Sequence, residues 1–148
     1  MRKPLSFDFD MSQYTYSDTA NVKGFLEQFQ VNESQVEKME AIHHNVVAIL
    51  LLKLVKGDLY CSSGYRCERL NKAVGGQSTS QHTKCEAVDL EYYVNGIERN
   101  DLLFEACKEL PDFDQLIKEK GTENNPAWIH VSFVNSKSNR KQILTIKK

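Results

Sequence analysis

Two short segments, far apart in the chain, carry side chains that one metal ion could bind together. The first, Ser80–Asp89, contains His82 and Asp89, and the second, Trp128–Ser132, contains His130. Two imidazoles and one carboxylate form a three-ligand set for zinc that leaves a fourth position open for water. A fold that uses all three must place the strand holding Asp89 close to the strand holding His130.

The local pattern supports this reading only when the three residues are taken together. Asp89 lies inside an apolar run, where a carboxylate is costly to bury unless it is paired or binds a metal. His82 alone is typical of a solvated loop, and His130 alone is typical of a hydrogen-bonded core histidine. Neighbouring strands that aim Asp89 and His130 at one point would favour a metal site over these alternatives.

The rest of the chain changes from helical to strand-like patterns near Gly57, without a regular βαβ alternation. This order indicates an α+β domain, with N-terminal helices packed on a small, mainly antiparallel sheet whose exposed face carries the metal. Residues 1–20 are polar, and we interpret them as an irregular N-terminal arm that precedes one domain at 21–148. The predicted helices are 22–30, 34–56 (opening with the capping box Ser34-x-x-Glu37), 70–74 and 101–110 (capped by Asn100), and the predicted strands are 59–62, 87–93, 113–118, 128–133 and 142–146.

Composition excludes some kinds of partner. The 19 basic and 20 acidic side chains lack the basic excess of nucleic-acid-binding proteins. The most apolar run, 46–55, is too short to span a membrane, and no apolar signal segment follows Met1. The four cysteines show no metal-binding spacing. We therefore expect a monomer that is cytoplasmic when synthesised, has reduced thiols, and binds neither nucleic acid nor membrane.

Three motifs resemble those of the zinc D-Ala-D-Ala carboxypeptidases and their peptidoglycan endopeptidase relatives. They are Ser80-x-His82-x-x-Cys85-x-Ala87-x-Asp89, Trp-Ile-His-Val-Ser around His130, and the upstream Ser63-Gly64-Tyr65-Arg66. The run 70–76 before Ser80 is also typical of the branch found in phage lysins. The likeness covers roughly residues 35–134.

The resemblance implies a zinc metallopeptidase domain that cleaves a bond in the stem peptide or cross-bridge of peptidoglycan, without a nucleophilic side chain. It also implies that a phage or prophage product of this kind acts on the cell wall after release. Carried over by position, it assigns zinc to His82, Asp89 and His130, and substrate contacts to Arg66, Tyr65 and Ser80. The Arg66 guanidinium would steady negative charge on the reacting peptide.

The general base is less directly indicated. Many members of the family place a glutamate three residues before the last histidine, where this chain has Ala127. The run 113–119 resembles a segment of the Hedgehog signalling domain, a fold relative that also holds zinc, and this likeness makes Glu119 our prediction for the base. Asp114 is the second choice, either as base or as a residue that orients a histidine ligand. Glu123 is the third.

Two departures from the family pattern leave a second function open. Cys85 stands where the family usually has glycine, so its side chain could crowd the metal or supply a fourth ligand that closes the open position. The missing Glu-x-x-His pattern also removes the residue that many family members use as the general base. The alternative is a zinc-containing binding protein on the same fold that hydrolyses nothing. The motifs do not say which peptidoglycan bond would be cut.

Overall fold

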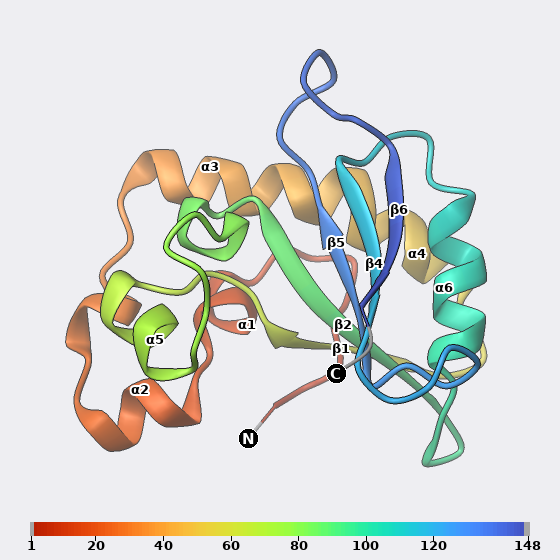
Figure 1. The fold of residues 1–148 in the computed structure, drawn as a ribbon, viewed down its shortest axis with the longest axis horizontal. Helices are drawn as coiled ribbons and strands as arrows, with labels where there is room; N and C mark the ends of the chain where they lie inside the picture. The colour runs from red at the N-terminus through yellow and green to blue at the C-terminus, as the bar shows by residue number, and fades with distance from the viewer. Residues whose placement is uncertain (1, 147–148) are drawn as a thin grey trace.

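The computed structural model describes residues 2–146 as one six-stranded mixed sheet with helices behind it and at one side (Figure 1). The strand order is β1-β2-β5-β4-β6, and the short β3 pairs with β2; every pairing is antiparallel except β4 with β6. The strands are β1 (Asp58–Ser63), β2 (Ala87–Val94), β3 (Ile97–Glu98), β4 (Gln115–Glu119), β5 (Trp128–Ser132) and β6 (Gln142–Ile146). The fold class is therefore the α+β arrangement that the sequence indicates.

The helices fall into a long rod behind the sheet and several short pieces. Successive segments α3, η2 and α4 continue one another, with η2 forming a π-helical turn, and the predicted helix 34–56 is confirmed as this rod (Figure 1). The helical segments are α1 (Met11–Thr15), α2 (Asp18–Lys23), η1 (Leu26–Phe29), α3 (Glu33–Ile42), η2 (His43–Val47), α4 (Ala48–Lys53), α5 (Glu68–Ala73), η3 (Gln81–Lys84) and α6 (Asn100–Lys108). Among residues 2–146, none of these helices is long and apolar enough to cross a membrane.

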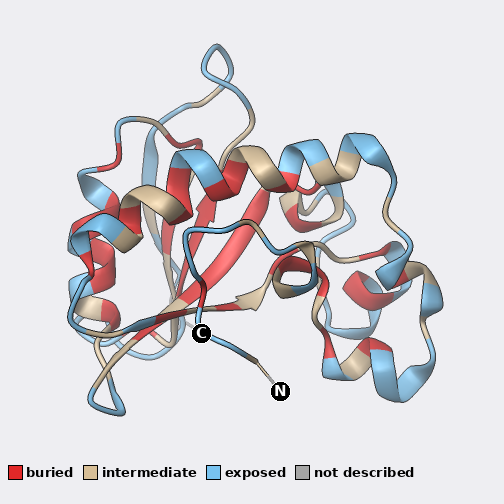
Figure 2. Cartoon of the chain, turned by 180° about the vertical axis from the view of Figure 1, so that it is seen from behind, coloured by how far each residue is buried: buried red, intermediate tan, exposed pale blue. Residues whose placement is uncertain are grey.

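Alternation along the strands separates a core face from an opposite face. Val88, Leu116, Ile129 and Val131 are buried and contribute to the hydrophobic core against the helices. Figure 2 shows this buried layer running along the sheet and along the inward side of the rod. Because successive side chains in a strand point to opposite faces, Asp89 and His130 lie on the face away from that core.

The first twenty residues are not the irregular arm that their polar composition suggested. They contain α1 and the start of α2, and Tyr14 is fully buried in the main core. The Tyr14 hydroxyl lies 2.7 Å from Nδ1 of His43, whose Nε2 lies 2.8 Å from the carbonyl oxygen of Phe7. A neutral ring satisfies both contacts when Nε2–H donates to the carbonyl and Nδ1 accepts from the hydroxyl. The domain therefore includes this segment.

Two predicted caps also need correction. The cap of the rod lies two residues before the predicted Ser34, because Asn32 and Gln35 form a reciprocal capping box and the helix begins at Glu33. Asn100 is the first residue of α6 and not its cap, and its amide is fully buried. The Asn100 side chain accepts from the Tyr92 amide and donates to the carbonyl oxygens of Pro126 and Ala127. It thereby ties β2 to the segment that leads into β5.

Candidate metal centre

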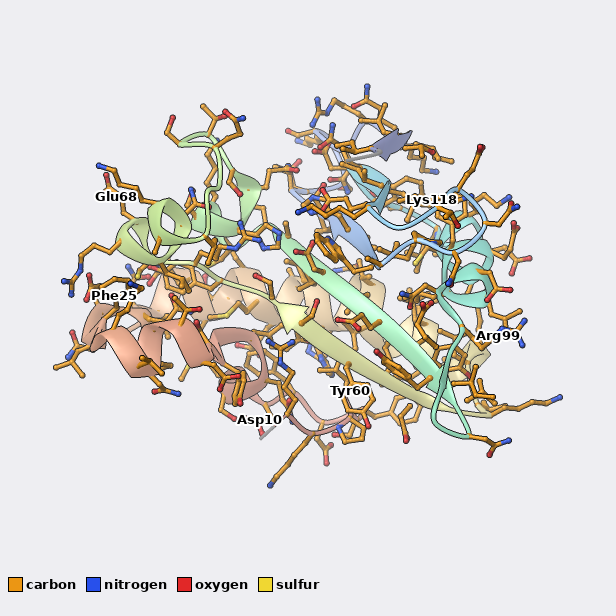
Figure 3. All side chains as sticks on the ribbon, turned by 60° about the horizontal axis from the view of Figure 1, so that its bottom comes forward. Asp10, Phe25, Tyr60, Glu68, Arg99 and Lys118 are labelled. Carbon is orange, nitrogen blue, oxygen red and sulfur yellow. The ribbon has the colours of Figure 1, made fainter. Side chains whose placement is uncertain are left out.

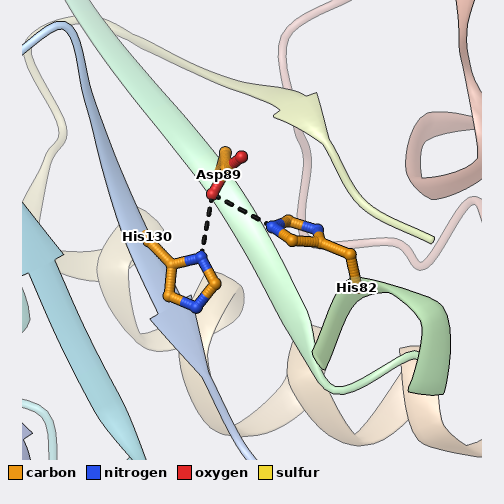
Figure 4. Close-up of side chains that lie close together, drawn as sticks. All are labelled: His82, Asp89 and His130. Atoms are coloured by element: carbon orange, nitrogen blue, oxygen red, sulfur yellow. Dashed lines mark hydrogen bonds and ion pairs between the residues drawn. The ribbon is translucent and has the colours of Figure 1, made fainter. Parts of the chain in front are cut away.

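The two strands predicted to meet do so in register. Asp89 on β2 is the direct partner of His130 on β5, and Oδ1 of the carboxylate lies 3.1 Å from Nδ1 of the ring. Nε2 of His82, from η3, approaches the same oxygen at 3.3 Å. Figure 4 shows the two rings converging on this carboxylate from different sides. The structure thus brings all three predicted ligands to one point.

The backbone around His82 fixes which ring nitrogen faces the carboxylate. Nδ1 of His82 lies 2.7 Å from the carbonyl oxygen of Gly64, and since a carbonyl only accepts, Nδ1 carries the proton. Gly64 itself packs tightly on α1, because a Cβ there would lie 2.4 Å from the Tyr14 carbonyl oxygen. Histidine ligands commonly donate their second N–H to such a carbonyl, which fixes the tautomer. Nε2 of His82 is therefore the ring nitrogen that faces Asp89 and could bind a metal ion.

This donor set fits a divalent metal ion. The ligand atoms of His82, Asp89 and His130 all lie within 4.8 Å of one another, and the three side chains are buried. Two histidine nitrogens face one carboxylate oxygen, and either a ring proton or a metal ion supplies the positive charge that stabilises such a contact. Burial alone would raise the pKa of Asp89, but charge interactions and hydrogen bonds with His82 and His130 outweigh it and hold the pKa below its ordinary value.

Cys85 does not crowd this centre. It has a left-handed backbone with φ of 58° at the end of η3, the conformation in which glycine is the easiest residue. Its side chain is buried in the main hydrophobic core, where burial raises the pKa of the thiol to about 11. Among the described residues, the group able to hold a metal comprises His82, Asp89 and His130 without Cys85. The suggested fourth ligand is therefore contradicted, and the backbone conformation explains the family glycine.

Arg66 lies beside the centre in a fixed orientation. Its Nε donates to Oγ of Ser63 at 3.0 Å, and its two terminal nitrogens reach Oδ1 of Asn71 at 3.2 Å and Oδ2 of Asp89 at 3.5 Å. Asp89 thus turns one oxygen to the histidines and the other to a guanidinium. Such an arrangement leaves a positive charge beside the candidate metal centre.

Glu119 borders the same cavity as His82 and His130, which measures about 710 Å³. Its strand pairs with β5 so that Ile117 opposes His130 and Glu119 opposes Trp128, on the face that carries the metal centre. Nε1–H of Trp128 donates to Oε2 of Glu119. This hydrogen bond fixes one oxygen of the carboxylate, and Trp128 was not among the site residues predicted from the sequence.

Asp114 borders that cavity too, but its oxygens are occupied. Oδ1 accepts from the backbone amide and Nε of Arg140, and Oδ2 accepts from Arg140 at 2.8 Å and from Nε2 of Gln81 at 2.8 Å. These contacts, chiefly those with Arg140, lower the pKa of Asp114 to about 2. A carboxylate held this way is a poor base near neutral pH. Its contacts tie the segment before β6 to the turn that carries His82.

The other two predicted substrate contacts serve the scaffold in this structure. Ser80 caps η3, and its hydroxyl accepts from the amide of His82 at 3.2 Å. The amide of Tyr65 donates to the Tyr14 carbonyl, and its own carbonyl accepts from Nε2 of Gln28. Ser80 borders the cavity with the histidines, while Tyr65 borders a second cavity beyond Arg66. Contact of Ser80 and Tyr65 with substrate stays a prediction.

Gln28 is a second residue that the sequence analysis missed. It is completely buried, donates to the carbonyl oxygens of Thr15 and Tyr65, and accepts from the amide of Cys67. These bonds hold the residues on either side of Arg66. A glutamine in a polar segment far from the motifs carries no sequence signal for such a role.

Comparison with known proteins agrees with this geometry. The family model described as Peptidase M15 matches residues 8–132, a span that includes all three residues of the metal centre. No curated protein matches the chain.

Proposed function

Because the chain belongs to the Peptidase M15 family and is therefore a zinc-dependent peptidase, we propose that its substrate is the peptide part of peptidoglycan. The support is the likeness of its three motifs to those of the D-Ala-D-Ala carboxypeptidases and peptidoglycan endopeptidases. The same likeness supports the proposal that the protein acts on the cell wall after release from the cell that makes it.

We propose that Nε2 of His82, Nδ1 of His130 and a carboxylate oxygen of Asp89 hold the zinc ion. Three protein ligands leave room for water and substrate, as in other catalytic zinc sites. Zinc at this site would polarise the scissile carbonyl and would lower the pKa of a bound water to about 7. The Gly64 carbonyl keeps His82 in the tautomer that this role needs.

Glu119 would take the proton from the attacking water and pass it to the leaving amine. One of its oxygens is fixed by Trp128, so the carboxylate has a defined direction at the edge of the cavity. Arg66 would hold the substrate carbonyl and steady the negative charge that develops on it. No side chain has to form a covalent bond to the substrate.

The observation that carries this proposal is the meeting of two histidine nitrogens on one oxygen of Asp89, with both histidines lining a cavity that Glu119 and Arg66 also border. A structural ion pair would explain the first contact alone. It would not explain why a second carboxylate and a guanidinium border the same cavity.

The test is digestion of purified cell walls, with the products identified by mass spectrometry. The zinc-loaded protein should release peptide fragments, and chelation should abolish release. Glu119→Gln should lower the rate by at least about 100-fold while retaining zinc, because the substitution removes the proton acceptor and leaves the metal ligands intact. Glu105→Gln, at an exposed position on α6 away from both cavities, is the matched control and should remain active.

Other outcomes distinguish the alternatives. A protein that binds one zinc ion and releases nothing from a range of walls would be the non-catalytic binding protein considered above. Full activity in Glu119→Gln would reject Glu119 as the base without rejecting the metal centre.

A further inference from the structure

The metal centre lies where two cavities meet. The first, which we call cavity A, measures about 710 Å³ and is bordered by His82, His130 and Glu119. The second, cavity B, measures about 520 Å³ and is bordered by Asp89, Thr19 and Trp128. Each is in the size range of clefts that hold small molecules or a few residues of a peptide.

Arg66 separates the two cavities without closing either one. It borders both, as does Val74, and its guanidinium is held by Ser63, Asn71 and Asp89. Figure 3 shows the helical region labelled by Phe25 and Glu68 on one side of the start of β2, and the strand labelled by Lys118 on the other. The two cavities therefore share Arg66 and Val74 as lining residues, with ligand candidates from the metal centre in each.

This position of the cation bears on which bond is cut. An enzyme that removes a C-terminal residue needs a positive group at the end of its cleft, where it binds the terminal carboxylate. Here Arg66 contacts Oδ2 of Asp89 at 3.5 Å, and cavity B lies on its other side. The arrangement suits a peptide that passes through the site more than one that ends there.

The walls of cavity B suit a peptide with polar and charged side chains. Arg2 lies over the ring of Tyr16 and Lys120 lies over the ring of Trp128, while Asp18 and Glu91 border the same cavity. Each cation therefore shares the cavity with carboxylates and contacts an aromatic face. Neither forms a dedicated pocket for a terminal carboxylate.

We propose that the substrate lies across the metal centre as an extended peptide, with residues on one side of the scissile bond in cavity A and those on the other side in cavity B. The protein then cuts internal bonds and is an endopeptidase. This inference rests on the proposed function, and it names the side chains around cavity B as a substrate subsite.

The test compares Thr19→Tyr, which fills cavity B from α2, with Ser34→Tyr, which adds the same ring at an exposed position on α3. Wild type and the control should release fragments of two or more residues from both sides of the cut bond. Thr19→Tyr should lower kcat/KM on walls by about tenfold or more, with unchanged zinc content. If it does not fold, Asp18→Trp at the exposed rim of the same cavity replaces it.

Three results would overturn the inference. Release of single C-terminal amino acids only, unaffected by Thr19→Tyr, would make the protein a carboxypeptidase and leave the proposed function in place. Internal cleavage that Thr19→Tyr leaves unchanged would remove cavity B from the substrate site. Failure of the zinc-loaded protein to release anything from any wall would overturn both this inference and the proposed function.

Discussion

Asp89 and His130 form a direct cross-strand pair between β2 and β5, with Oδ1 of the carboxylate 3.1 Å from Nδ1 of the ring. Opposed residues in an antiparallel pair point to the same face, so the register alone aims both side chains at one place. The third ligand, His82, reaches that place from a turn fixed by Gly64 and Ser80. Two ligands thus depend on strand pairing and one on a loop.

Replacing Asp89 with asparagine should weaken zinc binding by at least about 100-fold, because the change removes the only negative charge among the three ligands. Competition with a zinc-buffering chelator measures the affinity. Glu91→Gln, which removes a carboxylate from the same strand, is the control and should bind zinc like wild type. Equal affinity in Asp89→Asn would show that the ion is held elsewhere.

Trp128→Phe should lower kcat by about 5- to 50-fold with little change in KM or zinc content. The substitution keeps an aromatic ring but removes the N–H that holds Oε2 of Glu119, so the base loses part of its orientation. Steady-state kinetics on a soluble wall fragment provides the measurement. Tyr60→Phe removes a polar atom from another aromatic residue of the sheet and should have no effect. A wild-type kcat in Trp128→Phe would show that Glu119 needs no such support.

Asp114→Asn should reduce the free energy of unfolding at neutral pH by about 2 kcal/mol, as expected for a pKa lowered from 3.8 to about 2. Because the folded-state pKa is depressed, this stabilisation is present above the ordinary pKa and is lost as the pH falls towards 2. The difference between wild type and variant in urea unfolding should therefore shrink between pH 7 and pH 3. Asp112→Asn should change stability little. A variant with wild-type stability but no activity would return Asp114 to the catalytic candidates.

Gln28→Leu should lower the free energy of unfolding by about 2–4 kcal/mol, since it leaves two buried carbonyls and one amide without partners. The folded fraction should also show a raised KM, because the residues flanking Arg66 lose their support. Chemical denaturation and kinetics on the same sample separate the two effects. Gln30→Leu, at an exposed position nearby, should stay within about 0.5 kcal/mol of wild type. An unchanged KM would limit Gln28 to a structural role.

The metal centre shows which features of a site can be predicted from sequence motifs and which cannot. The identity of its three residues followed from ligand chemistry and from the resemblance of their motifs to those of the zinc peptidases, and the strands near Asp89 and His130 were predicted close to their observed bounds. The surroundings were not predictable in the same way. Cys85 looked like an obstacle to zinc, but its left-handed backbone turns the side chain into the core. A sequence shows which residue is present and not the direction in which it points.

The sequence by itself determined the fold class, the long helix and the strands around Asp89 and His130, because these depend on local periodicity. The predicted helix 22–30 was wrong, because α2 ends at Lys23 and η1 covers Leu26–Phe29. Only the tertiary structure decided that Tyr14 belongs to the core, that Asp114 is bound by Arg140, and that Trp128 holds Glu119. Each of these depends on a contact between side chains distant in the chain. Packing of the whole domain sets such contacts, so no local pattern records them.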